Sequence, residues 1–248
     1  MHFADERISV CPHDTAKNQL AWYTFNTYLQ RKLGVKLHFE PQANFLEERR
    51  LVLEDPRYRL VYANPFSAGL FREQLGFIPV ACPADLFDET MLVKRAGAEL
   101  PAEGCLRIAS ATDKLIVHTL GLMLLNDAGI AGERREFTFV GSHAAAAQAL
   151  NKGKADLGFV YNETWHGLNE SSRKQLEVVK ESQTRLAFHC FCIAPAWRNR
   201  LSEIQEILCQ MHEDEKGRAI LAELKFSRLV PLEENALDDL AEIMTLFA

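Results

Sequence analysis

The chain has 248 residues, 48% of them hydrophobic, which is enough for a large core in one domain or two lobes. Its formal net charge of -6, without a run of basic residues, argues against nucleic acid as a partner. No apolar stretch approaches the length of a membrane span. Residues 1–10 are polar and charged, so the protein is either cytoplasmic or has lost an export signal.

The six cysteines show no C-x-x-C pair, which argues against a disulfide or metal framework. We predict buried free thiols instead. Two of them alternate within an apolar run and should share one face of a strand. The six are Cys11, Cys82, Cys105, Cys190, Cys192 and Cys209.

The first third of the chain alternates strand and helix patterns, which indicates an α/β fold. We expect strands at residues 7–11, 35–40, 58–63 and 77–81, and helices at 14–32, 45–53 and 66–75. Asp14 is the expected N-cap of the first helix, and Gly34 is its stop.

A second series begins with expected strands at residues 91–95 and 105–110 and a long helix at 112–127. The segment 137–163, FTFVGSHAAAAQALNKGKADLGFVYNE, then predicts a strand, a turn at Gly141, a helix capped by Ser142, and a second strand. Two strands joined in this way should be parallel in one sheet. Strands at 176–182 and 187–194 follow, and residues 195–248 are mostly helical with a break at 229–231.

Two α/β series with a helical tail favour two lobes over one wide sheet. We expect residues 1–84 and 188–248 in one lobe and 90–184 in the other, so that the C-terminal helices return to the first lobe. A cleft between the lobes is then the natural ligand site, closed by a hinge.

Ligands of such sheets lie beyond the carboxyl ends of strands, near helix N-termini. Tyr62, Asn64, Tyr161 and Asn162 follow strands and are either ligand contacts or turn residues. His143 follows the Ser142 cap and could donate to a ligand oxygen. His13 and Asp14 follow the first strand, and we favour a plain helix cap for Asp14.

Four segments together resemble one family, the substrate-binding components of phosphate, phosphite and phosphonate ABC transporters. They are Tyr62-Ala63-Asn64-Pro65 before a helix, the strand, turn and long helix of 106–130, the G-S-H and G-K-A-D pattern of 137–160, and the C-terminal stretch from Gly217 through Val230-Pro231. The resemblance implies a two-lobed, type 2 periplasmic-binding fold. From the resemblance and the strand-end positions together, we expect ligand contacts at Tyr62, Asn64, Ser110, Thr112, Asp113, Ser142, His143, Tyr161 and Asn162.

The sequence departs from the family at the start of the long helix, where hydroxyl groups and a glycine usually hold an anionic head group. Here the run is Ser110-Ala111-Thr112-Asp113-Lys114, with an acid in place of a hydroxyl. Ser110 and Asp113 either form a capping box or contact the ligand. If Asp113 faces the ligand, its charge favours a zwitterion such as an aminoalkyl phosphonate, and if it caps the helix a simple oxyanion fits.

We therefore predict a solute-binding protein of a phosphonate- or phosphate-type ABC transporter, with a permease as its partner. The alternatives are a stand-alone ligand sensor or a cofactor-biosynthesis enzyme on the same fold.

We do not expect the protein to be an enzyme, because the sequence contains no nucleophile elbow, P-loop, dinucleotide motif or H-E-x-x-H. Cys11 and His13 are also too close in sequence to form a nucleophile–base pair readily. We expect no cofactor, and no metal site, since the set His118, His143, His166, Asp113 and Glu163 lacks ligand spacing. The resemblance favours a periplasmic location after signal removal.

Overall fold

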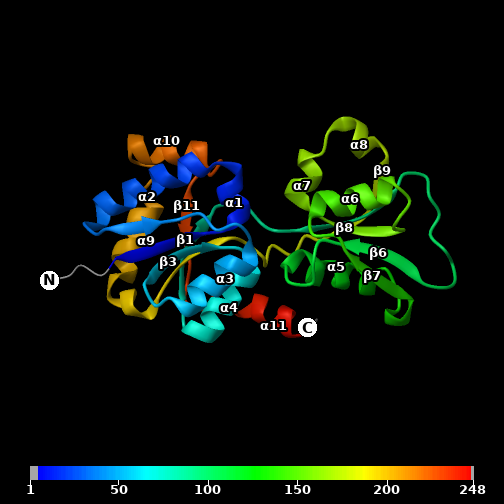
Figure 1. Cartoon of the computed structure of the whole chain (residues 1–248), viewed down its shortest axis with the longest axis horizontal. Coiled ribbons are helices and arrows are strands. Elements are labelled where there is room, and N and C mark those ends of the chain that lie inside the picture. Colours follow the sequence, from blue (N-terminus) through cyan, green and yellow to red (C-terminus); the bar gives the residue numbers. More distant parts are fainter. Residues whose placement is uncertain (1–4, 247–248) are drawn as a thin grey trace. The chain divides into compact units, whose positions relative to one another are not determined.

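The computed structural model of the protein describes residues 5–246, and the chain forms two α/β units, each built on its own sheet (Figure 1). Unit 1 comprises the described residues up to Leu86 together with Phe188–Ala241, and unit 2 comprises Phe87–Ala187 with the end of the last helix. The predicted α/β class with two separate sheets is confirmed. The predicted lobe ends at residues 1 and 248 lie outside the described residues.

Unit 1 contains a six-stranded sheet with the order β11-β4-β10-β3-β1-β2. Its strands are β1 (Glu6–Val10), β2 (Leu37–Phe39), β3 (Tyr58–Ala63), β4 (Ile78–Pro83), β10 (Cys190–Ile193) and β11 (Leu229–Pro231). Strand β1 is parallel to β2 and β3, whereas β10 is antiparallel to β3 and β4. The carboxyl ends of β1 and β3 and the amino end of β10 therefore lie at the same end of the strands, which we call the carboxyl edge of the sheet.

Helices cover both faces of this sheet (Figure 1). On one face lie α2 (Gln19–Leu33), α9 (Leu201–Cys209) and α10 (Glu215–Glu223), and on the other lie α3 (Phe45–Glu54) and α4 (Pro65–Leu75). The remaining helices of unit 1 are the short α1 (Pro12–Lys17) and the 3-10 helix η2 (Pro195–Arg200). The core includes Trp22 and Phe25 of α2, packed on Tyr62 and Phe191 of the sheet. These large aromatic side chains anchor α2 on β3 and β10.

Unit 2 contains a five-stranded sheet with the order β7-β6-β8-β5-β9. Its strands are β5 (Thr90–Arg95), β6 (Leu106–Ser110), β7 (Arg135–Phe139), β8 (Leu157–Tyr161) and β9 (Leu176–Glu181). Strand β6 is parallel to both of its neighbours, β7 and β8. The prediction that the strands of segment 137–163 are parallel in one sheet is therefore confirmed, with β6 inserted between them.

Two helices sandwich the unit 2 sheet because side chains alternate across each strand. Helix α6 (His143–Asn151) packs on Ala109 and Val160, while α5 (Ile116–Asp127) packs on Ile108 and Phe159. The short elements η1 (Gly132–Arg134), α7 (Asn162–Gly167) and α8 (Glu170–Lys174) complete unit 2, and α11 (Asp238–Leu246) is the last described helix.

The prediction of one helix over residues 14–32 is wrong, because the structure has two helices there, α1 and α2, and the first begins at Pro12. Pro12 begins α1, where its missing N–H is no loss. Asn18 then interrupts the helix and caps α2, accepting a 3.1 Å hydrogen bond from the Ala21 N–H. Asp14 lies inside α1, so its predicted capping role is also wrong. Gly34 ends α2 in the left-handed conformation, as predicted.

The break predicted at residues 229–231 is the short strand β11, which pairs antiparallel with β4.

All six cysteines are free, and four of them are buried, as predicted. Cys105 is exposed and Cys209 half-buried, contrary to that prediction. The Sγ atoms of Cys190 and Cys192 lie 3.5 Å apart on the shared face that alternation indicated. Among residues 5–246, no helix is both long enough and apolar enough to cross a bilayer.

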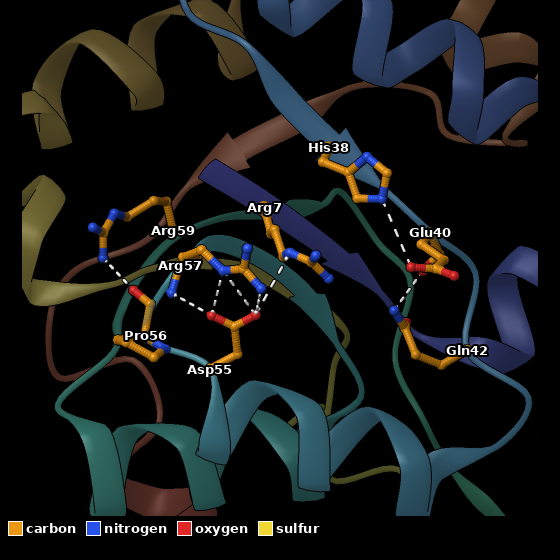
Figure 2. A network of polar contacts seen from close by, with 8 residues as sticks. All are labelled: Arg7, His38, Glu40, Gln42, Asp55, Pro56, Arg57 and Arg59. Atoms are coloured by element: carbon orange, nitrogen blue, oxygen red, sulfur yellow. Dashed lines mark hydrogen bonds and ion pairs between the residues drawn. The ribbon is translucent and has the colours of Figure 1, made fainter. Parts of the chain in front are cut away.

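An ion-pair network lies at the amino ends of β1 and β3, the edge opposite to the predicted site (Figure 2). Asp55 lies 2.8 Å from Nη2 of Arg57 and 3.5 Å from Nε of Arg7. The hydrogen bonds from Arg57 hold the pKa of Asp55 below its usual value. His38 and Glu40 form a longer contact of 3.7 Å nearby. Such partly exposed pairs contribute little to stability.

Candidate ligand-binding site

In unit 2, the carboxyl ends of the parallel strands β6, β7 and β8 gather several of the predicted site residues. The Val140 N–H donates to the Ser110 carbonyl and the Gly141 N–H to the Ala111 carbonyl, both at 2.9 Å. These bonds hold the turn after β7 beside the loop after β6. The His143 ring lies 5.7 Å from the Tyr161 ring at the end of β8. Backbone bonds therefore join the segments after β6 and β7, and one side-chain contact joins the segments after β7 and β8.

The N-terminus of α6 is built as the sequence predicted. Gly141 has a φ of 81°, a conformation that favours glycine. The Ser142 hydroxyl accepts a 3.1 Å hydrogen bond from the Ala145 N–H and caps the helix. His143 is the first helical residue and is half-buried. A helix N-terminus carries partial positive charge, so this end of α6 favours an anionic group.

The loop between β6 and α5 differs from the prediction, because α5 begins at Ile116 and not at residue 112. The Thr112 hydroxyl accepts a 3.2 Å hydrogen bond from the Lys114 N–H, a local bond that competes with helix formation. The N-cap of α5 is Leu115, which makes no side-chain cap bond. The capping box of Ser110 and Asp113 is therefore wrong. Asp113 is half-exposed, with Lys114 Nζ 3.7 Å from its carboxylate.

Ser110 points into unit 2, with 1% of its surface exposed. Its Oγ lies 3.1 Å from Nδ1 of His118, a buried residue of α5 that the sequence did not single out as a partner of Ser110. The His118 ring packs edge-on against Phe137 and Phe159, with centroids at 5.0 and 5.5 Å. Burial lowers the pKa of His118, so its imidazole is neutral at pH 7.

The side chains of Tyr161 and Asn162 form hydrogen bonds with the segment that precedes β5. The Tyr161 hydroxyl donates to Oδ1 of Asp88 at 2.9 Å. The Asn162 amide donates to the Phe87 carbonyl at 3.0 Å and accepts from the Glu89 N–H at 3.3 Å. Both ends of the Asn162 side chain are therefore used within unit 2, which is the turn role that the sequence left open.

The predicted residues of unit 1 are buried at the carboxyl end of β3. The Tyr62 ring packs within the aromatic core, 4.7 Å from Phe191 and 4.9 Å from Trp22. Asn64 caps α4, and its Oδ1 accepts a 3.0 Å hydrogen bond from the Ser67 N–H. Both side chains therefore have structural partners at this edge.

The same edge of unit 1 holds a polar cluster that joins Cys11, Asp14 and His189. Nδ1 of His189 lies 2.7 Å from Oδ2 of Asp14, and the Cys11 N–H donates to the Tyr62 carbonyl at 2.7 Å. Burial alone would raise the pKa of Asp14, but the pairing with His189 holds it well below its usual range. Sequence patterns did not predict this pairing, because His189 directly precedes the distant strand β10, which is placed here only by its antiparallel pairing with β3.

A thiol, an imidazole and a carboxylate also make up a nucleophile–base triad, but Cys11 does not suit that role. Its surface is 0% exposed, so a substrate has no access to the sulfur. Burial raises the thiol pKa to about 11, whereas a cysteine nucleophile needs a lowered pKa.

A buried carboxyl group, Glu48 of α3, lies on the other face of unit 1 and was also missed. Its Oε2 accepts a 3.2 Å hydrogen bond from the Ser67 hydroxyl, and the same hydroxyl accepts from Nε of Arg49 at 2.9 Å. Burial raises the pKa of Glu48 to about 7. Glu48 is one of several charged residues in FLEERRLVLE, so the sequence pattern gave no sign that its side chain turns inward.

Comparison with known families gives one match over almost the whole chain. Residues 8–237 match the family described as ABC transporter, phosphonate, periplasmic substrate-binding protein. No curated relative matches the sequence.

Several solved structures share the fold. PhnD1 from Prochlorococcus marinus, in complex with methylphosphonate, has 17% sequence identity, 97% coverage of both chains and a TM-score of 0.77. XAC2383 from Xanthomonas citri, bound to chloride ion, has 15% identity, 98% coverage of both chains and a TM-score of 0.78. The periplasmic aliphatic sulphonate binding protein SsuA from Escherichia coli has 13% identity and a TM-score of 0.68, covering 98% of this chain and 86% of its own. At these identities the likeness concerns the fold alone.

Proposed function

Because the chain belongs to the family of periplasmic substrate-binding proteins of phosphonate ABC transporters, we propose that it binds a small phosphonate or related oxyanion and delivers it to a permease. One observation supports this proposal at the level of individual residues. Ser142 and His143 form the N-terminus of α6 beside Tyr161, at the carboxyl edge of the unit 2 sheet. The dipole of α6, its free N–H groups and the imidazole of His143 all favour an oxyanion at this position.

The predicted site residues divide by burial into two proposed roles. Apart from Asn162, whose amide is hydrogen-bonded at both ends, those with exposed or half-buried side chains are the proposed direct contacts: Thr112, Asp113, Ser142, His143 and Tyr161. The others are proposed to hold the two sheet edges in shape: Tyr62, Asn64, Ser110 and Asn162. The proposed location is the periplasm, where the permease partner of this family receives its ligand.

Isothermal titration calorimetry with phosphate, phosphite, methylphosphonate and 2-aminoethylphosphonate tests this function. We expect saturable binding of at least one of the four to the full chain, with one site per molecule. Binding of 2-aminoethylphosphonate alone would assign a zwitterionic ligand, and binding of the simple anions would assign an oxyanion site. Heats of dilution alone with all four compounds would refute the proposal and favour the sensor or enzyme alternatives.

The variant His143→Ala is expected to weaken binding of the best of these ligands by about 10- to 100-fold. A hydrogen bond to a charged group contributes about 1.5–3 kcal/mol, and 1.4 kcal/mol corresponds to a factor of ten. Calorimetry at pH 7 measures the change. The matched control is His166→Ala, an exposed histidine of α7 in the same unit, which should leave the affinity unchanged. Equal affinity in wild type and His143→Ala would remove His143 from the site.

The variant Asp113→Asn is expected to strengthen binding of methylphosphonate by no more than about fivefold. The carboxylate is half-exposed with Lys114 Nζ 3.7 Å away, and two unit charges 4 Å apart in water interact by only about 1 kcal/mol. The gain should shrink as salt is added, because exposed charges are screened. A loss of 2-aminoethylphosphonate affinity in the same variant would instead indicate that Asp113 holds the ammonium group.

A further inference from the structure

Cys11, Asp14 and His189 of unit 1 bring three metal-binding atoms together. One donor atom from each residue lies within 4.8 Å of the other two, the one such group of His, Cys, Asp and Glu side chains found among residues 5–246. Cys11 is fully buried, whereas Asp14 and His189 each keep 12% of their side-chain surface exposed. The atoms of Asp14 and His189 that face each other, Oδ2 and Nδ1, are themselves buried, so the exposed part of each side chain lies away from the other donors.

Each donor is held in place by the backbone. The Cys11 N–H donates to the Tyr62 carbonyl at 2.7 Å, which fixes the residue at the end of β1. The Asp14 N–H donates to the Cys11 carbonyl at 3.0 Å, so the first turn of α1 sets the carboxylate beside the thiol. His189 directly precedes Cys190, which pairs with Ala63 in the sheet. All three donors thus lie in or directly beside β1, α1 and β10 of one unit.

We propose that Cys11, Asp14 and His189 form a binding site for a divalent transition-metal ion of borderline softness, with Zn²⁺ as the best match. Thiolate, imidazole and carboxylate are the ligand types that Zn²⁺ takes, at about 2.0–2.3 Å. Three protein ligands leave the fourth position of a tetrahedral ion for water or an external ligand. The prediction of no metal site considered a different set of residues, and Cys11 and His189 are too far apart along the chain to show ligand spacing.

Positive and negative side chains both lie around the cluster. Lys17 Nζ lies 3.2 Å from Oδ1 of Asp14, so this lysine orients the carboxylate and leaves Oδ2 toward the imidazole. Metal binding forms the sulfur–metal bond and releases the thiol proton to solvent, so the affinity should rise with pH.

The ordinary alternative is a His–Asp ion pair above a buried thiol, and it makes a different prediction. An ion pair without metal affinity gives no spectroscopic signal with a metal ion. Cobalt(II) is the probe of choice, because a thiolate–cobalt bond produces a near-ultraviolet charge-transfer band. Neither outcome depends on whether the protein binds a phosphonate.

The experiment titrates the reduced, metal-stripped full chain with cobalt(II) at pH 7.5 and then with Zn²⁺. We expect the charge-transfer band to saturate at one equivalent and to disappear when Zn²⁺ replaces cobalt. Cys11→Ser should abolish the band. His189→Gln and Asp14→Asn should weaken metal affinity by more than the about 10- to 100-fold typical of outer-shell changes.

Two matched variants serve as controls, Cys105→Ser for an exposed thiol and His38→Gln for an imidazole beside a carboxylate. Both should bind cobalt(II) like the wild type. No charge-transfer band in the wild type, or an unchanged band in Cys11→Ser, would overturn the proposal. If Cys11→Ser does not fold, X-ray absorption of the zinc-loaded wild type decides, since the site requires one sulfur among nitrogen and oxygen ligands.

Discussion

The variant Trp22→Ala is expected to lower the free energy of unfolding by about 3–5 kcal/mol, the usual cost of removing a buried tryptophan side chain. Trp22 is 1% exposed, and its ring contacts Tyr62 at 4.9 Å, Phe25 at 5.3 Å and Phe226 at 6.2 Å. Removal leaves a cavity between α2 and the sheet of unit 1. Guanidinium unfolding followed by far-ultraviolet circular dichroism measures the loss.

The matched control for this prediction is Leu20→Ala, on the same helix. Leu20 is 75% exposed, so its truncation should change stability by less than about 0.5 kcal/mol. If the two units unfold in separate steps, the loss in Trp22→Ala should fall on one transition and leave the other in place. A loss as small as that of Leu20→Ala would show that the aromatic cluster does not anchor α2.

Local signals in the sequence predicted most of the fold. The strand at Tyr58–Ala63 has the predicted bounds, because its β-branched and aromatic residues end at Asn64-Pro65. Ser142 caps α6, and Gly34 and Gly76 end their helices in the left-handed conformation, since these features depend only on neighbouring residues. The errors arose where a local bond competes with the helix, as at Thr112, or where a strand lacks a pattern of its own, as at 229–231.

The candidate site could be predicted in part for the same reason. Ser142 and His143 follow a predicted strand and begin a predicted helix, so their place at the sheet edge could be inferred. His118 and His189 could not be found in this way, because their partners Ser110 and Asp14 belong to other elements. The contact of His189 with Asp14 depends on the antiparallel pairing of β10 with β3, which no motif in the sequence encodes.

A pH-dependent loss of stability is expected from Glu48, whose pKa rises from 4.5 to about 7 on burial in the folded protein. An acid with a raised pKa binds its proton more tightly in the folded state. Its contribution to stability is therefore complete below pH 4.5 and is lost as the pH rises through 7. At 1.36 kcal/mol per pKa unit, the full loss is about 3 kcal/mol.

Charged groups of α1, of α3 and of the segment before β10 shift the pKa of Glu48 in opposite directions. Arg49 and His189 lower the pKa of Glu48, as does the Ser67 hydrogen bond, while Asp14 raises it. Burial outweighs these effects, because the carboxyl group has no water to solvate its charge.

The test compares the wild type with Glu48→Gln, which keeps the shape and removes the charge, in urea at pH 5 and pH 8 with a chelator present. We expect the wild type to lose about 2.5 kcal/mol relative to the variant between these pH values, most of it between pH 5 and 7. The control Glu54→Gln removes an exposed carboxylate of the same helix, 2.7 Å from Arg50, and should change little with pH. A constant difference between wild type and Glu48→Gln across the pH range would mean that Glu48 stays ionised in the folded protein. Arg49 would then have to compensate the buried charge fully, and Arg49→Met should destabilise the protein more at pH 8 than at pH 5.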